Sequence, residues 1–132
     1  MKLKVITPER AVLESDDTRH LLLPAENGEV GILPGHIAMV CSMQVGRIRA
    51  EGAGGAVVLA TSGGYAEVLA DSITVLAETA ERAEEIDVAR ATEARDRAHQ
   101  RLRRRDDPDL NVVRARAALA RAINRLRIAS GE

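Results

Sequence analysis

The 132 residues of this chain are enough for one ordinary domain or for a small domain with an appendage, and 45% of them are hydrophobic. Tyr65 is the only aromatic residue, so a packed core must be aliphatic, and a net charge of -1 argues against a general binder of polyanions. Cys41 is the single cysteine, which excludes a disulfide framework and a cluster of thiolate metal ligands.

The first 80 residues predict short β-strands. Runs rich in Val, Ile and Leu alternate with turn signals every ~8–12 residues, which is typical of a sandwich or barrel. The expected strands are residues 2–6, 10–14, 18–23, 29–33, 36–42, 45–51, 56–61, 64–70 and 72–78. We therefore expect an all-β domain of about ten short strands over residues 1–84, within an α+β chain.

A first helix is expected after residue 86. Asp87 is a natural N-cap, and neither Gly nor Pro follows it before Pro108. The helix should end near Arg104. Its apolar stripe consists of small and branched residues at helical spacing: Ala91, Ala94, Ala98 and Leu102.

A second helix is expected from Asp107, as the N-cap, and Pro108, as the first helical residue, to Ser130-Gly131. Its apolar side is marked by Val112, Leu119, Ile123 and Leu126. Two helices joined by so short a turn should pack as an antiparallel hairpin, which we place at residues 85–132. The packing between the two helices should be weak, because burying Ala instead of Leu forfeits about 2 kcal/mol of transfer free energy.

The positive charge is concentrated in the helical segment. Residues 81–132 carry 13 Arg and 10 acidic residues, whereas residues 1–80 carry 6 Lys and Arg and 10 acidic residues. Spacings of seven and eleven residues return a helix to nearly the same face, so two arginine stripes are predicted. They are Arg90, Arg97 and Arg101, and Arg114, Arg121 and Arg125. The positive charge of these stripes can be balanced by water and salt, by a phosphate ligand or by an acidic partner.

Spacing alone favours a solvated basic face with pairs such as Glu93–Arg97 over a nucleotide site. Asp87 and Arg90 can pair across the first turn of the helix. In the second helix the stripe lies roughly opposite Leu119, which predicts that it faces away from the apolar side. The sequence has no phosphate-binding loop, His-Glu-x-x-His or Gly-x-Ser-x-Gly motif, so we expect neither catalytic nor metal-binding residues.

Five stretches of the sequence occur in an order and spacing that resemble one family. They are residues 6–9, 24–36, 61–68, 76–83 and 86–91. Together they are similar to the epsilon subunit of bacterial F-type ATP synthases, and Ile-Asp-x-x-Arg-Ala at residues 86–91 resembles the ATP-recognition motif of that family. Ala25, where the family often has Gly, and Cys41-Ser42 depart from the pattern without altering the assignment.

The resemblance implies a fold and a role. The β-sandwich would lie at the foot of the central stalk, against the gamma subunit and the c-ring, and help couple proton-driven rotation to ATP synthesis on other chains. The helical hairpin would move between a folded position and an extended one, in which it meets acidic residues of the beta subunits and blocks ATP hydrolysis. The chain would be non-catalytic and peripheral to the cytoplasmic side of the bacterial cell membrane, without inserting into it.

The resemblance also implies site residues and a regulatory ligand. No cofactor is required, and ATP would bind the folded hairpin. The candidate ATP contacts are Glu81, Ile86, Asp87, Arg90, Ala91, Arg97, Arg121 and Arg125. The candidate beta-subunit contacts are Arg101, Arg114, Arg116, Arg121 and Arg125. These arginines would bind either ATP or the beta subunits, one partner at a time. Competition between the two partners for the arginines would then be the switch.

Two other functions stay open at this point. A passive assembly adaptor would share the fold without the switch. A nucleic-acid-binding module would use the Arg-rich hairpin, but ten acidic residues and the lack of a stacking platform of aromatic residues argue against it.

Overall fold

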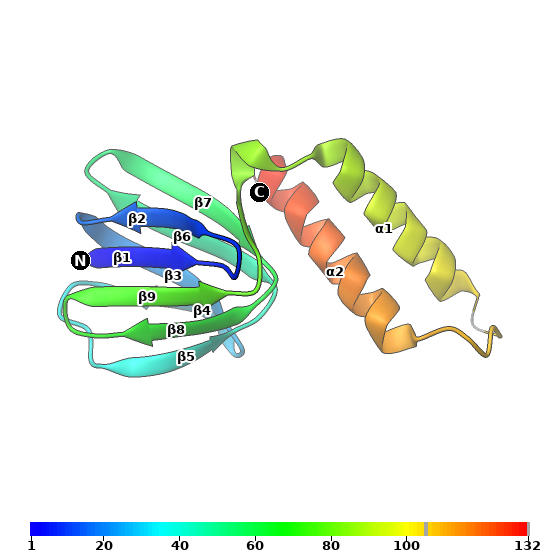
Figure 1. The fold of residues 1–132 in the computed structure, drawn as a ribbon, viewed down its shortest axis with the longest axis horizontal. Coiled ribbons are helices and arrows are strands. Elements are labelled where there is room, and N and C mark those ends of the chain that lie inside the picture. Colours follow the sequence, from blue (N-terminus) through cyan, green and yellow to red (C-terminus); the bar gives the residue numbers. More distant parts are fainter. Residues whose placement is uncertain (105, 132) are drawn as a thin grey trace. The chain divides into compact units, whose positions relative to one another are not determined.

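The chain folds into two compact units, Met1–Arg82 and Ala83–Glu132. Figure 1 shows them in a computed structural model, which describes residues 1–104 and 106–131. Arg105 and Glu132 lie outside the described residues, and Glu132 is the last residue of the expected second domain.

Ten strands form the first unit. They are β1 (Lys2–Ile6), β2 (Ala11–Ser15), β3 (Thr18–Ala25), β4 (Gly28–Ile32), β5 (Met39–Met43), β6 (Gly46–Gly52), β7 (Gly55–Thr61), β8 (Gly64–Val68), β9 (Ser72–Ala77) and β10 (Ala80–Arg82). All nine predicted strands are confirmed, with shifts at their ends. The tenth strand, β10, was not predicted, because three residues are too few to show an alternating pattern.

The strands form one continuous hydrogen-bonded path that folds over itself into two layers (Figure 1). The path runs β10-β7-β6-β3-β5-β8-β9-β1-β2, and β4 pairs with β3 outside it. Neighbouring strands are antiparallel except β1 and β9, which pair in parallel with Leu3 opposite Ile73 and Val5 opposite Val75. The predicted β-sandwich is confirmed.

The core between the layers is aliphatic, as the composition predicts. Along β1 the side chains of Leu3 and Val5 are buried, whereas Lys2 and Lys4 are exposed, because successive side chains of a strand point to opposite faces. The largest fully buried side chains are Leu21, Leu23, Ile32, Ile48, Leu59 and Ile73. The only aromatic side chain, Tyr65, lies outside this core and is 60% exposed.

The second unit begins with the short 3-10 helix η1 (Ala83–Glu85), followed by α1 (Val88–Arg103) and α2 (Val112–Ala129). Asp87 caps α1, as predicted, and the helix ends next to Arg104. The predicted start of α2 is wrong, because Asn111 and not Asp107 is its N-cap. The Asp107 side chain instead accepts a hydrogen bond from the Asp109 amide at 2.9 Å, closing a separate turn before the helix.

The two helices pack as an antiparallel hairpin, and small residues line their interface (Figure 1). The buried residues are Ala91 and Ala98 on α1 and Ala115, Ala122 and Ile128 on α2. Each alanine pair is seven residues apart and so occupies one helix face. We call these four alanines the alanine seam.

The seam lies on the apolar side of α2 that the sequence predicts, because Leu119 follows Ala115 by four residues and precedes Ala122 by three. Leu119, Ile123 and Leu126 are only partly buried, and Val112 is 39% exposed. The fully buried positions of this face are alanines, which let the two backbones approach, and the larger side chains on it stay partly exposed. Across residues 1–104 and 106–131, neither helix combines the length and apolar character that crossing a membrane requires.

Candidate functional site

The candidate ATP contacts fall on both units. Glu81 lies on β10 of the first unit, and the other seven lie on the second. Within the second unit Ile86 and Ala91 are buried, whereas Arg90 and Arg97 are exposed on α1. The hairpin therefore divides this set into residues that pack and residues that face outward.

Asp87 caps the N-terminus of α1. Its carboxylate accepts a hydrogen bond from the backbone N–H of Arg90 at 3.1 Å, and its carbonyl accepts one from the N–H of Ala91 at 3.0 Å. The pairing predicted between Asp87 and Arg90 thus runs through the main chain of Arg90 and not through its guanidinium. Asp87 satisfies an amide that the helix itself leaves without a partner.

Arg121 and Arg125 lie closer to the apolar side of α2 than the sequence predicts. Both are half-buried. Arg121 precedes the buried Ile128 by seven residues, and Arg125 follows the buried Ala122 by three, so each shares a side of the helix with a buried residue. Arg121 and Arg125 are thus less exposed than predicted, although Leu119, from which the prediction was made, lies on the same helix face as Ala115 and Ala122.

The three remaining candidate beta-subunit contacts are exposed and share one end of the hairpin. Arg101 is in the last turn of α1, while Arg114 and Arg116 are near the start of α2. Because the helices are antiparallel, those two ends meet at the turn. Arg90 and Arg125 lie toward the opposite end, near η1, so the two candidate contact sets have different centres along the hairpin.

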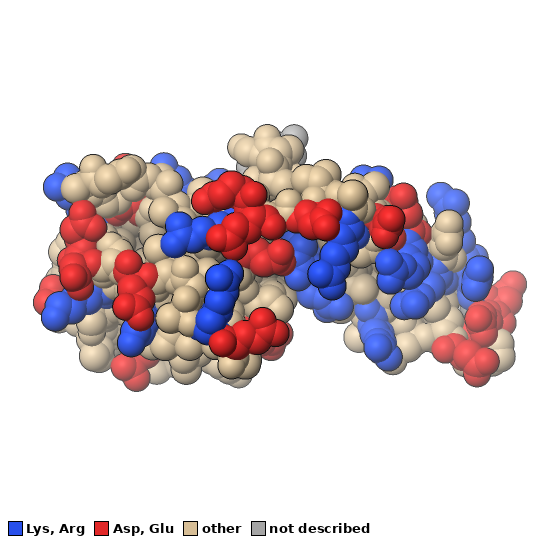
Figure 2. Space-filling view, turned by 45° about the horizontal axis from the view of Figure 1, so that its top comes forward, with Lys and Arg blue, Asp and Glu red and all other residues tan. Residues whose placement is uncertain are grey.

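The surface charge of the helical unit is dominated by arginine. Figure 2 shows Lys and Arg gathered over this unit, with acidic side chains at the turn between the helices. The acidic residues of that turn are Asp106, Asp107 and Asp109, all exposed. Arg101, Arg114 and Arg116 lie at the same end of the hairpin, so the charge there is mixed, whereas the helix faces away from the turn carry an excess of positive charge.

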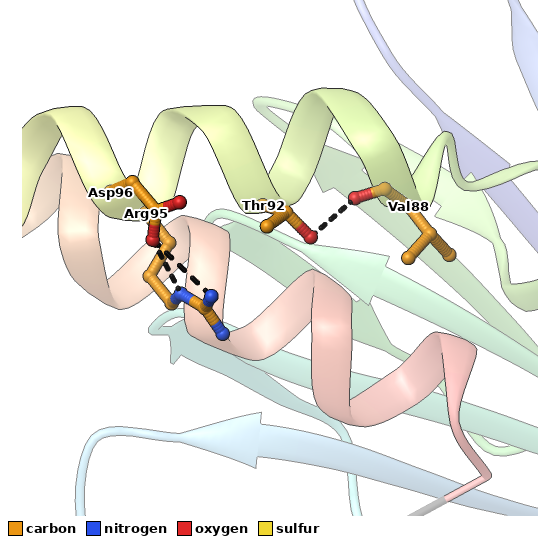
Figure 3. A network of polar contacts seen from close by, with 4 residues as sticks. All are labelled: Val88, Thr92, Arg95 and Asp96. Carbon is orange, nitrogen blue, oxygen red and sulfur yellow. Dashed lines mark hydrogen bonds and ion pairs between the residues drawn. The ribbon is translucent and has the colours of Figure 1, made fainter.

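One intrahelical ion pair lies on the exposed part of α1 (Figure 3). The Nε and Nη2 atoms of Arg95 each lie 3.2 Å from Oδ1 of Asp96, and Thr92 donates from its hydroxyl to the Val88 carbonyl at 2.8 Å. The sequence predicted such a pair at Glu93–Arg97, whereas the structure forms one between adjacent residues. A pair this exposed is worth less than about 1 kcal/mol.

The chain matches two family models, one for each unit. Residues 1–83 match "ATP synthase, Delta/Epsilon chain, beta-sandwich domain", and residues 84–130 match "ATP synthase, Delta/Epsilon chain, long alpha-helix domain". The chain belongs to the ATP synthase delta/epsilon family. Within the described residues, no group of three or more His, Cys, Asp and Glu side chains is placed to hold a metal ion.

Relatives in this family are similar over nearly the whole chain. The ATP synthase epsilon chain of Bacillus licheniformis is 43% identical over 129 residues, covering 98% of this chain and 97% of the relative. That of Syntrophobacter fumaroxidans is 45% identical over 129 residues, covering 98% and 95%. The agreement in length indicates that both units of this chain are shared with those family members.

Two solved structures share the fold. A chain of the Euglena gracilis mitochondrial ATP synthase superposes with a TM-score of 0.77 at 23% identity, covering 89% of this chain and 74% of that chain. A chain of the Tetrahymena thermophila mitochondrial ATP synthase central stalk and c-ring gives 0.64 at 14% identity, covering 99% and 94%. The family's fold thus persists at low sequence identity.

Proposed function

We propose that this chain is the epsilon subunit of a bacterial F-type ATP synthase, a non-catalytic part of the rotating central stalk. Residues 1–84 contact the gamma subunit and the c-ring, and residues 85–132 form a regulatory hairpin. The observation that carries the proposal is the match of both units to the family, with relatives of nearly equal length named epsilon chain. The subunit is peripheral, on the cytoplasmic side of the cell membrane.

The hairpin has properties that suit a movable regulatory element. Its interface is centred on alanines, which bury little apolar area. Each helix also satisfies a first-turn amide from its own N-cap, Asp87 in α1 and Asn111 in α2. Neither helix therefore needs the other for these bonds, and separating the pair exposes only the seam and the partly buried side chains around it.

The arginines supply the two anionic contacts that the switch needs. In the folded position Arg90, Arg97, Arg121 and Arg125 bind the triphosphate of ATP, and in the extended one Arg101, Arg114, Arg116, Arg121 and Arg125 meet acidic residues of the beta subunits. Guanidinium groups form charge-assisted, bidentate hydrogen bonds with either anion. ATP shifts the hairpin only by its differential affinity for the folded form.

Reconstitution tests the stalk function. Membrane vesicles that carry ATP synthase depleted of its epsilon subunit are supplied with the full chain or with a variant truncated after Ile86. We expect both to restore ATP-driven proton pumping, and the truncated variant to give the faster ATP hydrolysis. If neither restores pumping, the chain is not a coupling subunit. If hydrolysis is equal in the two, the chain is a passive adaptor.

Calorimetry of the isolated protein tests ATP binding separately. We expect heat of binding and thermal stabilisation at millimolar ATP, both reduced in Arg90→Gln. Arg103→Gln, an exposed arginine of the same helix outside the candidate set, is the matched control and should bind as the parent does. No heat and no stabilisation in the parent protein would remove ATP from the proposed regulation.

A further inference from the structure

The short strand β10 ends where the first unit ends. Arg82 is the last residue of both, and the chain that leads to the hairpin begins at Ala83. β10 is the first strand of the sheet path and pairs with β7, with Ala80 opposite Thr61 and Arg82 opposite Leu59. A strand of three residues at the end of a domain frays unless other contacts hold it. The contacts of β10 therefore decide where the sandwich ends and the movable chain begins.

The side chain of Arg82 joins the two ends of the sheet path. Its Nη2 atom donates a hydrogen bond to the main-chain carbonyl of Val12 on β2 at 3.4 Å. β2 is the last strand of the path and β10 is the first, so the path itself does not pair them. The bond is long and therefore weak by itself, but it acts on a strand of only three residues.

Val12 is a suitable acceptor because β2 is irregular at that residue. Val5 of β1 pairs with Leu13 and Ile6 pairs with Ala11, so the register between the two strands passes over Val12. The extra residue of a β-bulge is left out of the backbone pairing. The guanidinium of Arg82 thus meets β2 at the residue that the pairing with β1 leaves out.

The residues that lead into β10 are also fixed to the sandwich. The Glu78 amide donates to the Gly63 carbonyl at 2.9 Å, and the Thr79 hydroxyl donates to the Ser62 hydroxyl at 2.7 Å. Ala80 is part of the hydrophobic core. After Arg82 the short helix η1 contains no buried residue. The contacts that hold the chain to the sandwich therefore extend through residues 78–82, and Arg82 supplies the last of them.

We propose that Arg82 is a positioning residue of the hairpin switch. Its guanidinium keeps β10 on the sandwich, so the movement of the hairpin starts after Arg82 and its linker is residues 83–86. Loss of this contact releases β10 and lengthens the linker by three residues, about 10 Å of extended chain. A longer linker lowers the effective concentration at which the hairpin meets its partner. This inference rests on the hairpin movement of the proposed function.

Three variants of the full chain and one control test the role of Arg82. Arg82→Gln removes the guanidinium, whereas Arg82→Lys keeps a positive charge and a donor without the planar fork. Insertion of Gly-Ser-Gly between Arg82 and Ala83 lengthens the linker but leaves the contact with Val12 in place. Arg19→Gln changes an exposed arginine of β3 and is the matched control. Amide exchange of the isolated protein reports on β10, and ATP hydrolysis of the reconstituted enzyme reports on the switch.

We expect Arg82→Gln to exchange the amides of β10 about fivefold faster, with β1 and β8 unchanged. Its relief of inhibited hydrolysis should be about twofold, because the linker grows from residues 83–86 to residues 80–86. Arg82→Lys should lie between Arg82→Gln and the parent in both measurements. The insertion should relieve inhibition as Arg82→Gln does while β10 exchanges as in the parent, and Arg19→Gln should change neither. ATP-driven proton pumping should persist in all four.

Four results would overturn the inference. Normal exchange of β10 in Arg82→Gln would show that the guanidinium does not hold the strand. Faster exchange in β1 and β8 as well would make Arg82 a general stabiliser of the sandwich. Faster exchange of β10 with unchanged inhibition would separate the contact from the switch, and an insertion without effect would exclude linker length as the cause. Should the parent chain not inhibit hydrolysis, the proposed switch fails, while the exchange comparison still decides whether Arg82 holds β10.

Discussion

Gly64 lies directly against the main-chain carbonyl of Leu76 on the neighbouring strand β9. A Cβ atom on Gly64 would overlap that carbonyl oxygen and lie 3.0 Å from the Cα of Ala77. Gly64 also has a φ of +138°, which L side chains rarely adopt. The close contact and the positive φ both require glycine at the start of β8, where Gly64 pairs with Ala77 of β9.

Substituting Gly64 should therefore weaken the sandwich more than substituting Gly54 or Gly55. We expect Gly64→Ala to lower the free energy of unfolding by about 3 kcal/mol or more, because β8 and β9 must separate. Gly55→Ala meets no atom but has a φ of +111°, so it should cost about 1–2 kcal/mol. Gly54→Ala has neither problem and should change stability by less than about 0.5 kcal/mol. Urea unfolding distinguishes the three, and equal losses would contradict the assigned contact.

The alanine seam should not tolerate a larger side chain. Ala122→Leu inserts three carbon atoms where the helices approach, so the hairpin should lose about 1–3 kcal/mol. Ala120→Leu adds the same atoms at an exposed position of α2 and serves as the control. Amide exchange should become faster in α1 and α2 of Ala122→Leu only, with the strands unaffected. Equal protection in the two variants would argue against close packing at Ala122.

The N-cap of α2 gives a direct test of where that helix begins. The Asn111 side chain accepts the Arg114 amide at 3.0 Å, whereas Asp107 accepts the amide of Asp109 in the preceding turn. Asn111→Ala should lower the stability of the hairpin by about 1 kcal/mol, and Asn111→Ser should restore most of it. Exchange at the Arg114 amide is the measurement. If Asp107→Ala had the larger effect on that amide, α2 would begin at Pro108.

Stability at acid pH should depend on Asp17. Hydrogen bonds from the Ser15 hydroxyl at 3.0 Å, the larger cause, and from the Ala53 amide at 3.3 Å lower the pKa of Asp17 below its ordinary 3.8. The unfolded chain then binds the proton more readily than the folded one. The stabilisation is thus fully present above about pH 4 and is lost as pH falls through the folded-state pKa.

Denaturation of Asp17→Asn between about pH 6 and about pH 2 should show this dependence. We expect the variant to be less stable than the parent at the upper end and to lose less on acidification. Asp16→Asn removes the neighbouring carboxylate and is the matched control. Parallel curves for Asp17→Asn and the parent would show that the hydrogen bonds of Asp17 do not contribute.

Substitutions at the two ends of the hairpin should affect binding of the two proposed partners differently. Gln substitution of Arg101, Arg114 and Arg116 should relieve inhibition of ATP hydrolysis in the assembled enzyme without weakening ATP binding by the isolated subunit. Substitution of Arg121 and Arg125 should affect both, because both partners share them. Steady-state hydrolysis and calorimetry measure the two effects. Loss of ATP binding in the first variant would contradict the division.

The strands and the start of α1 could be predicted because their signals are local. Alternation in a segment such as Ser72–Ala77 reflects which face is buried, and Asp87 followed by a helical pattern marks an N-terminus. The start of α2 could not be predicted in this way, because Asp107-Pro108 and Asn111-Val112 are both acceptable beginnings. Which one prevails depends on the hydrogen bonds of the intervening turn.

The candidate site was predictable in its charge but not in its orientation. Arginine spacing places each residue on a helix face, and Arg90 and Arg97 are exposed as that spacing allows. The positions of Arg121 and Arg125 depend on which face of α2 meets α1. Leu119 lies on that face between Ala115 and Ala122, so the sequence indicated the correct side of α2 but not how far the neighbouring arginines are covered. Which faces of two helices meet depends on both helices, so the residue pattern of one helix alone does not determine it.

The parallel pairing of β1 with β9 also bears on synthesis at the ribosome. Leu3 and Ile73 are seventy positions apart in the chain, yet they lie opposite each other in the sheet. A nascent chain that has just released its first strand has no parallel partner for it until β9 emerges. Closure of the sandwich must therefore wait until nearly the whole β unit has been translated, and during that interval the edge of β1 is open to other chains.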